Sequence, residues 1–480
     1  MRQTKKVGKV LLTMFLCISI FLLNGCAHSK EAVAALAQGE HTEQESDLIS
    51  EESAEIPGEG QAGDGASEAP SEENIGKGES GTSGEGEAGE NSSEAFSEKD
   101  SKEGSSETPT EGESQESASE DNENDDAITL EHQEENFTHL ATVHLVAAGD
   151  DLLHETVING GLKEDGTYDY SCFFSNLLDV FENADIAAIN QETIMGGAEK
   201  GYSGYPRFNS PDAIAEAIYK AGFDVVLQAN NHTLDMGISG LTHAISVWKQ
   251  YPSITLLGVN ETKEQYERIQ TVTRNGITIA MLSYTYGFNG NILPSKDYYM
   301  ANTLNRDKMK EDIKKAKELS DFVIVFPHWG TEYVYEPDSS EKSLAQFFAD
   351  QGVDLVIGGH PHVLQTAEWL TGENGNQTFV YYSLGNYISS MNYTDRMLGG
   401  LADVVIAKDG EKTYLESVHI IPIVTHYERG VESNFGVYRL SDYTEEMAKK
   451  HYIYGTSRGS DFSVSKMWEL TNQIVGEWVE

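Results

Sequence analysis

Short apolar runs recur along the second part of the chain, and each ends in polar residues. In the first run, from Leu140 to Ala148, apolar residues alternate and then become continuous, which is typical of a buried strand, and Gly149-Asp150 is expected to end it in a turn. Similar β-branched runs predict six more strands within residues 184–192, 222–232, 277–285, 321–330, 353–362 and 377–386.

Helical patterns separate several of these runs. Ser210 is the expected N-cap of an amphipathic helix with Pro211 in its first turn, and Gly222 is the expected stop. Charged amphipathic stretches at 305–320 and 340–352 precede two further strands. This alternation predicts an α/β fold with much parallel sheet, in which ligands bind at the carboxyl ends of the strands.

Side chains able to bind metals lie at or just past the ends of the predicted strands. These residues are Asp150, Glu192, Asn231, His232, His328, His360 and His362. If the strands share a sheet, their ends converge and these residues become neighbours. Carboxylate and imidazole groups suit Zn, Fe or Mn, and an Asn carbonyl can add an oxygen ligand. Because the pattern recurs at five strand ends, we favour one shared metal site over separate hydrogen-bonded loop residues.

Six motifs in a fixed order support this interpretation. They are AAGDD, INQE, QANNHTLDMG, PHWGTEY, GGHPHVLQ and SLGNYI, all between residues 142 and 395. In this order and at these spacings they resemble the CapA family of poly-gamma-glutamate capsule proteins, in the calcineurin-like metallophosphoesterase superfamily. The resemblance implies a four-layer α-β-β-α sandwich at 139–395 with two divalent metal ions (Mn, Fe or Zn) at the strand ends.

The resemblance also implies a role for each polar residue. Asp150 and His362 would hold the first metal, Glu192 would stand at the position of the bridging carboxylate, and Asn231, His328 and His360 would hold the second metal. His232 would be the acid next to the substrate. With both metals bound, such a site polarises a phosphoryl oxygen and activates a water molecule.

Two nearby residues are further candidates for the catalytic site. Asp235, three residues after His232, is expected to orient the imidazole ring. Arg207 is a candidate clamp for an anion, because a guanidinium matches phosphate or carboxylate oxygens; a surface ion pair is the alternative.

The first motif departs from the superfamily pattern. That pattern is usually Asp-x-His, whereas Leu152 stands two residues past Asp150, and His154 is a candidate substitute. Glu192 in place of the usual Asp also lengthens the bridging side chain by one methylene. The first metal is therefore expected to be weakly held or absent.

The first 140 residues have a different composition. The chain of 480 residues has a formal net charge of -46, and residues 31–140 hold 33 acidic and 3 basic side chains. Segment 27–138 is rich in Glu, Ser and Gly and predicts a disordered linker, with an acidic ion-binding tail as the alternative. Residues 141–480 are also acidic, with 46 acids and 25 bases, which excludes nucleic acid as a partner.

Residues 1–26 predict a lipoprotein-type signal peptide. A basic start is followed by an apolar run from Val10 to Leu23 and by Cys26, the expected lipidated residue. The alternative is an uncleaved N-terminal anchor, and both place the protein outside the cytoplasm, attached to the cell membrane. After cleavage and lipidation Cys172 would be the one remaining cysteine, so no intramolecular disulfide is expected.

The C-terminal segment, 396–480, is expected to complete the domain. Two strands joined by Asp409-Gly410 would finish the second sheet, and two helices would follow, the first with Ser441 as N-cap. Trp468 and Trp478 on the last helix are expected to pack in the core.

Two classes of function remain open at this stage. The family implies a role at the cell surface in the synthesis, anchoring or export of poly-gamma-glutamate or a related envelope polymer, while the fold implies a metal-dependent hydrolase. An enzyme needs both metals and His232. A non-catalytic scaffold of a capsule synthesis complex needs only the surface that contacts the polymer. The expected partners are an anionic polymer or phosphoester substrate, the membrane and a capsule synthesis complex.

Overall fold

The computed structural model describes residues 140–479, apart from the side chains of 431–433. The expected signal peptide and the expected linker lie outside these residues, as does Cys26. Within 140–479, none of the helices has the length and apolar character of a membrane-spanning segment.

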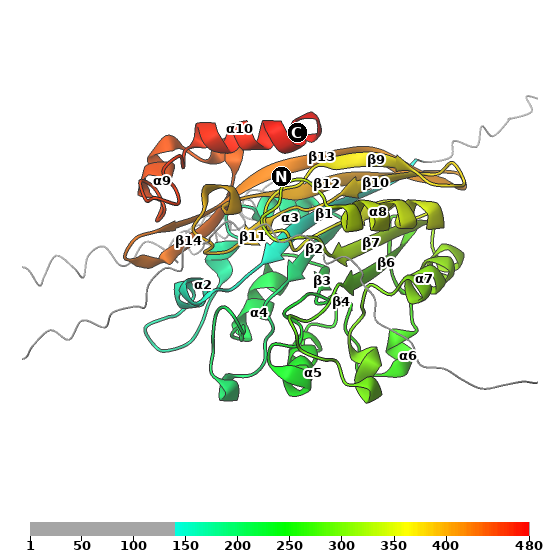
Figure 1. Ribbon diagram of the computed structural model, residues 1–480, viewed down its shortest axis with the longest axis horizontal. Coiled ribbons are helices and arrows are strands. Elements are labelled where there is room, and N and C mark those ends of the chain that lie inside the picture. Colours follow the sequence, from blue (N-terminus) through cyan, green and yellow to red (C-terminus); the bar gives the residue numbers. More distant parts are fainter. Residues whose placement is uncertain (1–139, 480) are drawn as a thin grey trace, which may run out of the picture. The chain divides into compact units, whose positions relative to one another are not determined.

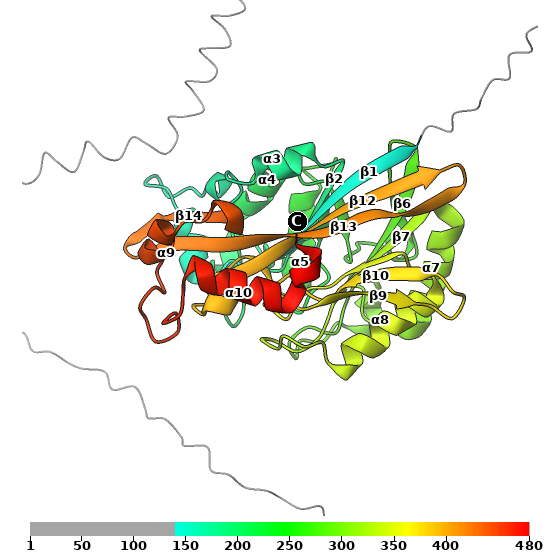
Figure 2. The same ribbon diagram turned by 90° about the horizontal axis from the view of Figure 1, so that it is seen from above.

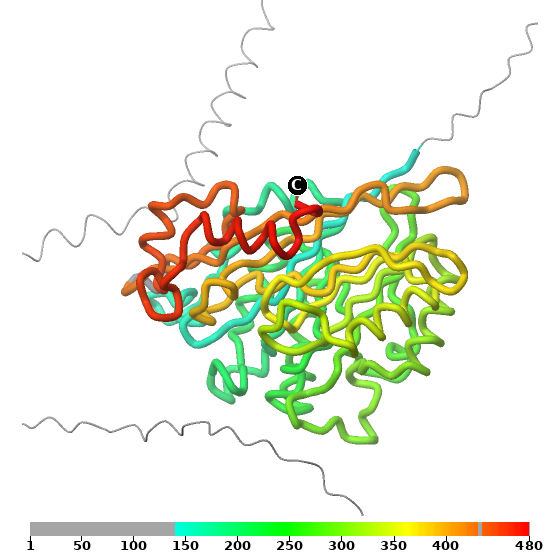
Figure 3. Tube along the Cα trace, turned by 45° about the horizontal axis from the view of Figure 1, so that its top comes forward, coloured from blue at the N-terminus to red at the C-terminus, as the bar shows by residue number. Residues whose placement is uncertain are grey.

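The first sheet combines a parallel half with an antiparallel half. Its order is β14-β13-β12-β1-β2-β3-β4, and β11 pairs with β1 beyond this path. The parallel strands are β1 (Ala141–Asp151), β2 (Ile186–Gln191), β3 (Val225–Leu227), β4 (Thr255–Leu257) and β11 (Asn386–Ile388). The antiparallel strands are β12 (Leu398–Asp409), β13 (Lys412–Glu428) and β14 (Val431–Arg439). The β12–β13 hairpin lies along β1, which carries the first predicted motif (Figure 3).

The second sheet has the order β5-β6-β7-β8-β10-β9. Its strands are β5 (Gln270–Arg274), β6 (Ile277–Thr285), β7 (Phe322–His328), β8 (Leu355–Ile357), β9 (Ala367–Thr371) and β10 (Gln377–Tyr381). The four central strands are parallel, and β5 and β9 are antiparallel edge strands.

Helices flank both sheets. The α-helices are α2 (Glu155–Gly160), α3 (Leu178–Asn183), α4 (Ala213–Lys220), α5 (Gly237–Trp248), α6 (Lys263–Tyr266), α7 (Arg306–Leu319), α8 (Ser339–Gln351), α9 (Glu445–Lys450) and α10 (Val464–Val475). Short 3-10 helices are η1 (Ser171–Phe173), η2 (Ala198–Lys200), η3 (Ser295–Met300), η4 (Thr394–Arg396), η5 (Leu440–Asp442) and η6 (Gly476–Trp478).

The alternation of side chains along β7 shows how the layers are built. Ile324 and Phe326 belong to the core shared with the first sheet, whereas Val323 and Val325 belong to a second core with residues of α7 and α8. On the other side, α4 and α5 contribute to the core of the first sheet. The order of layers is helix, sheet, sheet, helix, which confirms the predicted four-layer α-β-β-α sandwich (Figure 1).

Most predicted strands and helices are present, but the end of the first strand is not as expected. Gly149-Asp150 is not a turn, because β1 continues to Asp151 with a break in register on either side of Asp150. A Cβ atom on Gly149 would lie 2.0 Å from the carbonyl oxygen of Gly385, so only glycine permits this close approach. The carbonyl of Gly385 accepts a hydrogen bond from the Asp150 amide at 3.0 Å.

Three local expectations in other segments are wrong. Ser210 does not cap α4, since its hydroxyl bonds to Thr193 and the helix follows Asp212. The C-terminal strands join the first sheet instead of the second. The N-cap of α9 is Thr444, not Ser441.

After the last strand of the chain, α10 lies on the side of the first sheet opposite α4 and α5, and η6 follows it (Figures 1 and 2). There Trp478 is partly buried and packs on the core, as expected.

Candidate metal centre

The carboxyl ends of the parallel strands bring six of the predicted residues together. All six side chains are buried, and they come from β1, β7 and the segments after β2, β3 and β8: Asp150, Glu192, Asn231, His328, His360 and His362. One ligand atom each from Glu192, His360 and His362 lies within 4.8 Å of the others, and the same holds for Asp150, Glu192 and His328. Two groups of possible metal ligands therefore share Glu192.

Glu192 lies between two imidazoles. Its Oε1 is 3.5 Å from Nε2 of His328 and 3.6 Å from Nε2 of His362. Both carboxylate oxygens are buried, and neither has a hydrogen-bond partner among the described residues. Because a buried carboxylate oxygen without a partner is costly, this position fits a carboxylate that binds cations.

Asp150 is fixed from several directions. Its Oδ1 accepts a hydrogen bond from Nδ2 of Asn190 at 2.7 Å, and its Oδ2 accepts one from the His360 amide at 3.1 Å. Oδ2 is also 3.2 Å from Nδ1 of His362. Burial alone would raise the pKa of Asp150, but His362, His328 and Asn190 together hold it below its usual range. The carboxyl is therefore ionised, as a metal ligand must be.

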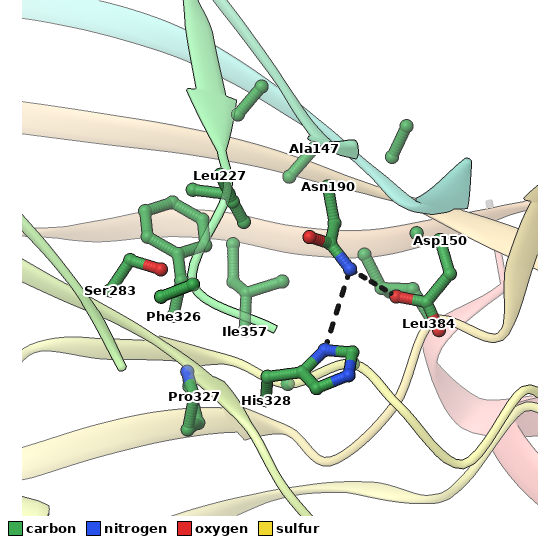
Figure 4. A pocket seen from close by; sticks show the side chains of 16 residues that line it. Ala147, Asp150, Asn190, Leu227, Ser283, Phe326, Pro327, His328, Ile357 and Leu384 are labelled. Atoms are coloured by element: carbon green, nitrogen blue, oxygen red, sulfur yellow. Dashed lines mark hydrogen bonds between the residues drawn. The ribbon is translucent and has the colours of Figure 1, made fainter. Parts of the chain in front are cut away.

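Asn190 is a residue of this site that the sequence analysis missed. Figure 4 shows its amide between Asp150 and His328, and its Nδ2 is 3.5 Å from Nδ1 of His328. Asn190 thus orients both the carboxylate of Asp150 and the imidazole of His328. Residues that hydrogen-bond to metal ligands commonly orient those ligands in this way.

The two histidines after β8 have an unusual backbone. The φ angles are +102° at His360 and +57° at His362, in the left-handed region that non-glycine residues seldom adopt. Such conformations persist where surrounding structure enforces them, often at functional sites. Here they place both rings in the candidate centre, with Nδ1 of His360 buried and without a partner among the described residues.

The two rings differ in charge. Burial and the neighbouring His328 hold the pKa of His360 well below its ordinary value. Burial also disfavours the charged form of His362, but Glu192 and Asp150 raise its pKa to about 9. The carboxylates of Glu192 and Asp150 therefore favour a positive charge near His362, and either a proton or a metal cation can supply it. The donor set fits divalent cations such as Mn, Fe or Zn.

Asn231 and His328 form the other side of the centre. Oδ1 of Asn231 is 2.9 Å from Nε2 of His328, and Nδ2 of Asn231 donates to Oδ1 of Asn289 at 3.3 Å. Asn289, in the loop after β6, was not predicted, and its own Nδ2 lies 3.4 Å from Nε2 of His232. This loop residue therefore connects a predicted ligand to the predicted acid.

His232 and Asp235 have the expected geometry. Nδ1 of His232 is 2.7 Å from Oδ2 of Asp235, and both side chains are buried. The same oxygen of Asp235 accepts a hydrogen bond from the Phe208 amide at 2.8 Å, and the Phe208 ring meets His232 edge to face. This arrangement orients the ring so that Nε2 points toward Asn289.

Arg207 contacts the backbone of the turn that carries His232 and Asp235. Its Nε and Nη2 donate to the backbone carbonyl of Asp235 at 3.2 and 2.7 Å. Among the described residues it has no ion-pair partner, so the surface ion pair is not what the structure contains. Its role as an anion clamp stays a prediction.

The departure in the first motif is visible in the structure. Leu152 is buried and apolar, and His154 belongs to neither group of possible metal ligands among the described residues. Burial and the nearby His362 lower the pKa of His154 to about 4, and its ring packs on Phe208. His154 therefore lies close to the centre as a neutral ring at its border.

Comparisons with known proteins agree with the motifs. A family model described as "Bacterial capsule synthesis protein PGA_cap" matches residues 144–391. A capsule biosynthesis protein CapA of Bacillus anthracis is 30% identical over 190 residues, which are 39% of this chain and 45% of the relative. A PGA biosynthesis protein CapA of Bacillus subtilis is 29% identical over 209 residues, 42% and 51% of the two chains. The chain thus spans about half the length of these curated relatives.

Solved structures resemble the fold only distantly. The NAD nucleotidase NadN of Haemophilus influenzae has 14% identity and a TM-score of 0.39, over 60% of this chain and 58% of the other. The calcineurin-like phosphoesterase YfkN of Bacillus subtilis has 13% identity and a TM-score of 0.35, over 70% and 97% of the chains.

Proposed function

The chain belongs to the bacterial capsule synthesis protein family PGA_cap, and on that premise we propose that it hydrolyses a phosphoester or related bond at a dinuclear metal centre. It does so at the cell surface, as part of the synthesis, anchoring or export of poly-gamma-glutamate or a related envelope polymer. Attachment through lipidated Cys26 belongs to the same proposal, and a Cys26→Ser variant should then leave the membrane fraction.

The observation that carries the proposal is the position of Glu192. Its two buried oxygens have no partner among the described residues, and they lie between the imidazoles of His328 and His362. A structural carboxylate is normally paired, whereas a bridging ligand must keep both oxygens available.

Each residue has a defined part in this proposal. By the family pattern, Asp150, Glu192 and His362 would hold one cation, and Glu192, Asn231, His328 and His360 the other. The contact of 3.2 Å between Asp150 and His362 agrees with this division, whereas the two groups of possible ligands place His360 with His362 and His328 with Asp150. Bound metals of this kind supply Lewis acidity and a nucleophilic hydroxide near neutral pH. As an imidazolium, His232 would give its Nε2 proton to the leaving oxygen, while Asp235 accepts a hydrogen bond from Nδ1 and so fixes the ring direction and stabilises the charged form.

A non-catalytic scaffold of a polymer synthesis or export complex is the second candidate. The observation in its favour is Leu152, which stands buried and apolar where the superfamily usually has a histidine. With one ligand fewer at the first position, a single bound metal would keep the fold without two-metal chemistry.

Metal analysis of the full chain, purified without chelators, separates the two candidates. We expect near two equivalents of Mn, Fe or Zn, lost in the Asp150→Asn/His360→Ala variant, together with metal-dependent hydrolysis of bis(p-nitrophenyl) phosphate. A single equivalent without hydrolysis would favour the scaffold. No metal, even after Mn, Fe and Zn are added back, would remove the hydrolase proposal.

A further inference from the structure

Arg396 is an unpaired cation beside the candidate metal centre. It lies at the end of η4, and its guanidinium carbon is 3.5 Å from the centroid of the Tyr333 ring and 4.1 Å from that of Tyr393. The side chain is half-buried between these two rings. Contact with both rings restrains the guanidinium and leaves its N–H groups as the part able to bind a ligand.

The guanidinium differs from those of Arg274 and Arg439, which form ion pairs. Arg274 pairs with Asp224 at 3.1 Å and Arg439 with Asp179 at 2.6 Å. Arg396 has no carboxylate at ion-pair distance within residues 140–479, and its Nε is buried without a hydrogen-bond partner there. Arg207 and Arg306 also have no ion pair, but their guanidinium groups donate hydrogen bonds, whereas Nε of Arg396 is a buried N–H without an acceptor among the described residues, which is costly.

One nearby carboxylate could have filled this position but has another partner. Asp395, the preceding residue, accepts a hydrogen bond from the hydroxyl of Tyr335 at 2.8 Å. The carboxylate of Asp395 is therefore bound to Tyr335, and the guanidinium of Arg396 remains available to an external anion.

Arg396 is also tied to the metal centre through Asn386. Oδ1 of Asn386 is 3.0 Å from Nδ1 of His362, and its Nδ2 donates to the carbonyls of His362 and Arg396 at 3.2 and 3.1 Å. The Tyr333 ring, in contact with the guanidinium, has its centroid 6.2 Å from that of His362. These contacts set Arg396 at a fixed position beside the centre, one aromatic ring away from His362.

Exposed aromatic rings border the centre on both sides. Tyr286 is 47% exposed, stacks parallel to His328 and lies 4.8 Å from the His360 ring. Tyr333 is 37% exposed on the side of His362. Both rings therefore lie beside predicted metal ligands, and Arg396 lies over the ring of Tyr333.

We propose that Arg396 binds an oxyanion, a carboxylate or phosphate, on a ligand whose reacting group lies at the metal centre. Arg396 is thus a specificity-determining residue, and it selects ligands with a second anionic group separated from the first by about the width of an aromatic ring. This inference rests on the proposed function for the identity of the ligand, an anionic envelope polymer or a phosphoester. The Arg396 position itself rests only on the contacts above.

Calorimetric titration of the full chain tests the proposal with two probes, inorganic phosphate and a γ-glutamyl tripeptide. Arg396→Ala should weaken the binding of at least one probe by about tenfold or more, since hydrogen bonds between charged groups are stronger than those between neutral groups. Arg396→Lys, which keeps the charge but loses the planar fork, should recover only part of the affinity. The probe that responds identifies the oxyanion as phosphate or carboxylate.

Arg306 offers a matched control. Its guanidinium also stacks on a ring, 4.8 Å from the centroid of Phe347, but it lies on α7 and bonds to Ser343. Arg306→Ala should bind both probes as the parent protein does. Equal binding by the parent and Arg396→Ala, or equal losses in both arginine variants, would overturn the proposal, as would a parent protein that binds neither probe.

Metal content and melting temperature, measured on the same samples, distinguish a failure of the Arg396 proposal from a failure of the hydrolase proposal. Arg396→Ala should retain the metal content of the parent; a variant that loses metal or melts earlier while its probe affinity is unchanged would show a structural role and overturn the inference. If the parent holds no metal, the hydrolase proposal fails, and the same titration in chelated protein still decides whether Arg396 binds the anion.

Discussion

Two groups of buried histidines lie in this domain, and they differ in what surrounds their ring nitrogens. In the C-terminal group, Nε2 of His451 is 3.1 Å from the carbonyl of Thr425, and its Nδ1 accepts from the amide of Ile453 at 3.2 Å. Nδ1 of His426 is 2.6 Å from the hydroxyl of Tyr443. The partners of His451 are neutral backbone groups, while Nε2 of His426 lies 3.6 Å from Oε1 of the partly exposed Glu428. The other group, at the strand ends, consists of His232, His328, His360 and His362.

The strand-end group faces carboxylates and leaves atoms without partners. Burial is similar in both groups, so burial of a histidine does not itself indicate function. The difference lies in Glu192, whose oxygens are unpartnered among the described residues, and in charge. Burial and His426 lower the pKa of His451 to about 3, whereas Glu192 and Asp150 raise that of His362 to about 9 against the effect of burial. The C-terminal group is a packing cluster, whereas the carboxylates of the strand-end group favour a positive charge beside them.

The largest expected effect is on turnover. His232→Gln should lower the rate constant for hydrolysis of bis(p-nitrophenyl) phosphate by about 10²–10⁴-fold, the usual contribution of a general acid, and leave the metal content unchanged. His426→Gln, in the C-terminal group, should keep the rate within about twofold, since it lies outside the proposed site. Equal rates for the two variants would show that His232 has no chemical role.

The convergence of the strand-end residues follows from the sequence because parallel strands share an edge. Apolar runs located these strand ends, and all six predicted ligands are buried together there. Asn190 was missed because its direction depends on the irregular register between β1 and β2 at Asp150. A one-residue break reverses which face a side chain takes, and its cause, the close approach of Gly385, comes from more than 200 residues away.

Other features depended on contacts that a local pattern cannot reveal. Asn289 reaches Asn231 and His232 from a loop in which its φ is +48°. The hairpin at Asp409-Gly410 is a local signal and is present, but the sheet that it joins is set by pairing with β1, far away in the chain. Arg396 likewise contacts Tyr333, in another segment of the chain, by stacking on its ring. Such a contact leaves no recognisable spacing of residues in the sequence.

The next expected effect is the stabilisation of the folded state by metal. Adding Mn at about 100 times its dissociation constant should stabilise the parent by about 2.7 kcal/mol per site. His451→Asn should show the same increment from a lower starting stability, whereas His360→Ala should show a much smaller one. Urea unfolding with and without Mn measures both increments. A full increment in His360→Ala would contradict the assignment of this residue as a ligand.

A smaller effect concerns the pH dependence of stability, and it belongs to the C-terminal group. The pKa of His451 is about 3 in the folded protein, below its ordinary value of 6.5, so between these values the unfolded chain binds the extra proton. The stability that neutral His451 contributes is complete above pH 6.5 and is lost as the pH falls toward 3. From pH 7.5 to 5 the parent should lose about 2 kcal/mol more than His451→Asn. Parallel pH profiles of the two proteins, measured by urea unfolding in chelator, would contradict the neutral state of this ring.

The smallest expected effect tests whether the C-terminal group is held by protein contacts alone. Thr444 caps α9, the helix directly before His451, by accepting a hydrogen bond from the Met447 amide, so Thr444→Ala should cost about 1 kcal/mol of stability. Ser441→Ala, at the position that the sequence pattern favoured, should cost less than about 0.5 kcal/mol. Urea unfolding with and without Mn provides the measurement, and both costs should be independent of the metal. A cost for Thr444→Ala that changes with Mn would mean that the two histidine groups are energetically coupled, and the contrast between a packing cluster and a binding centre would then not hold.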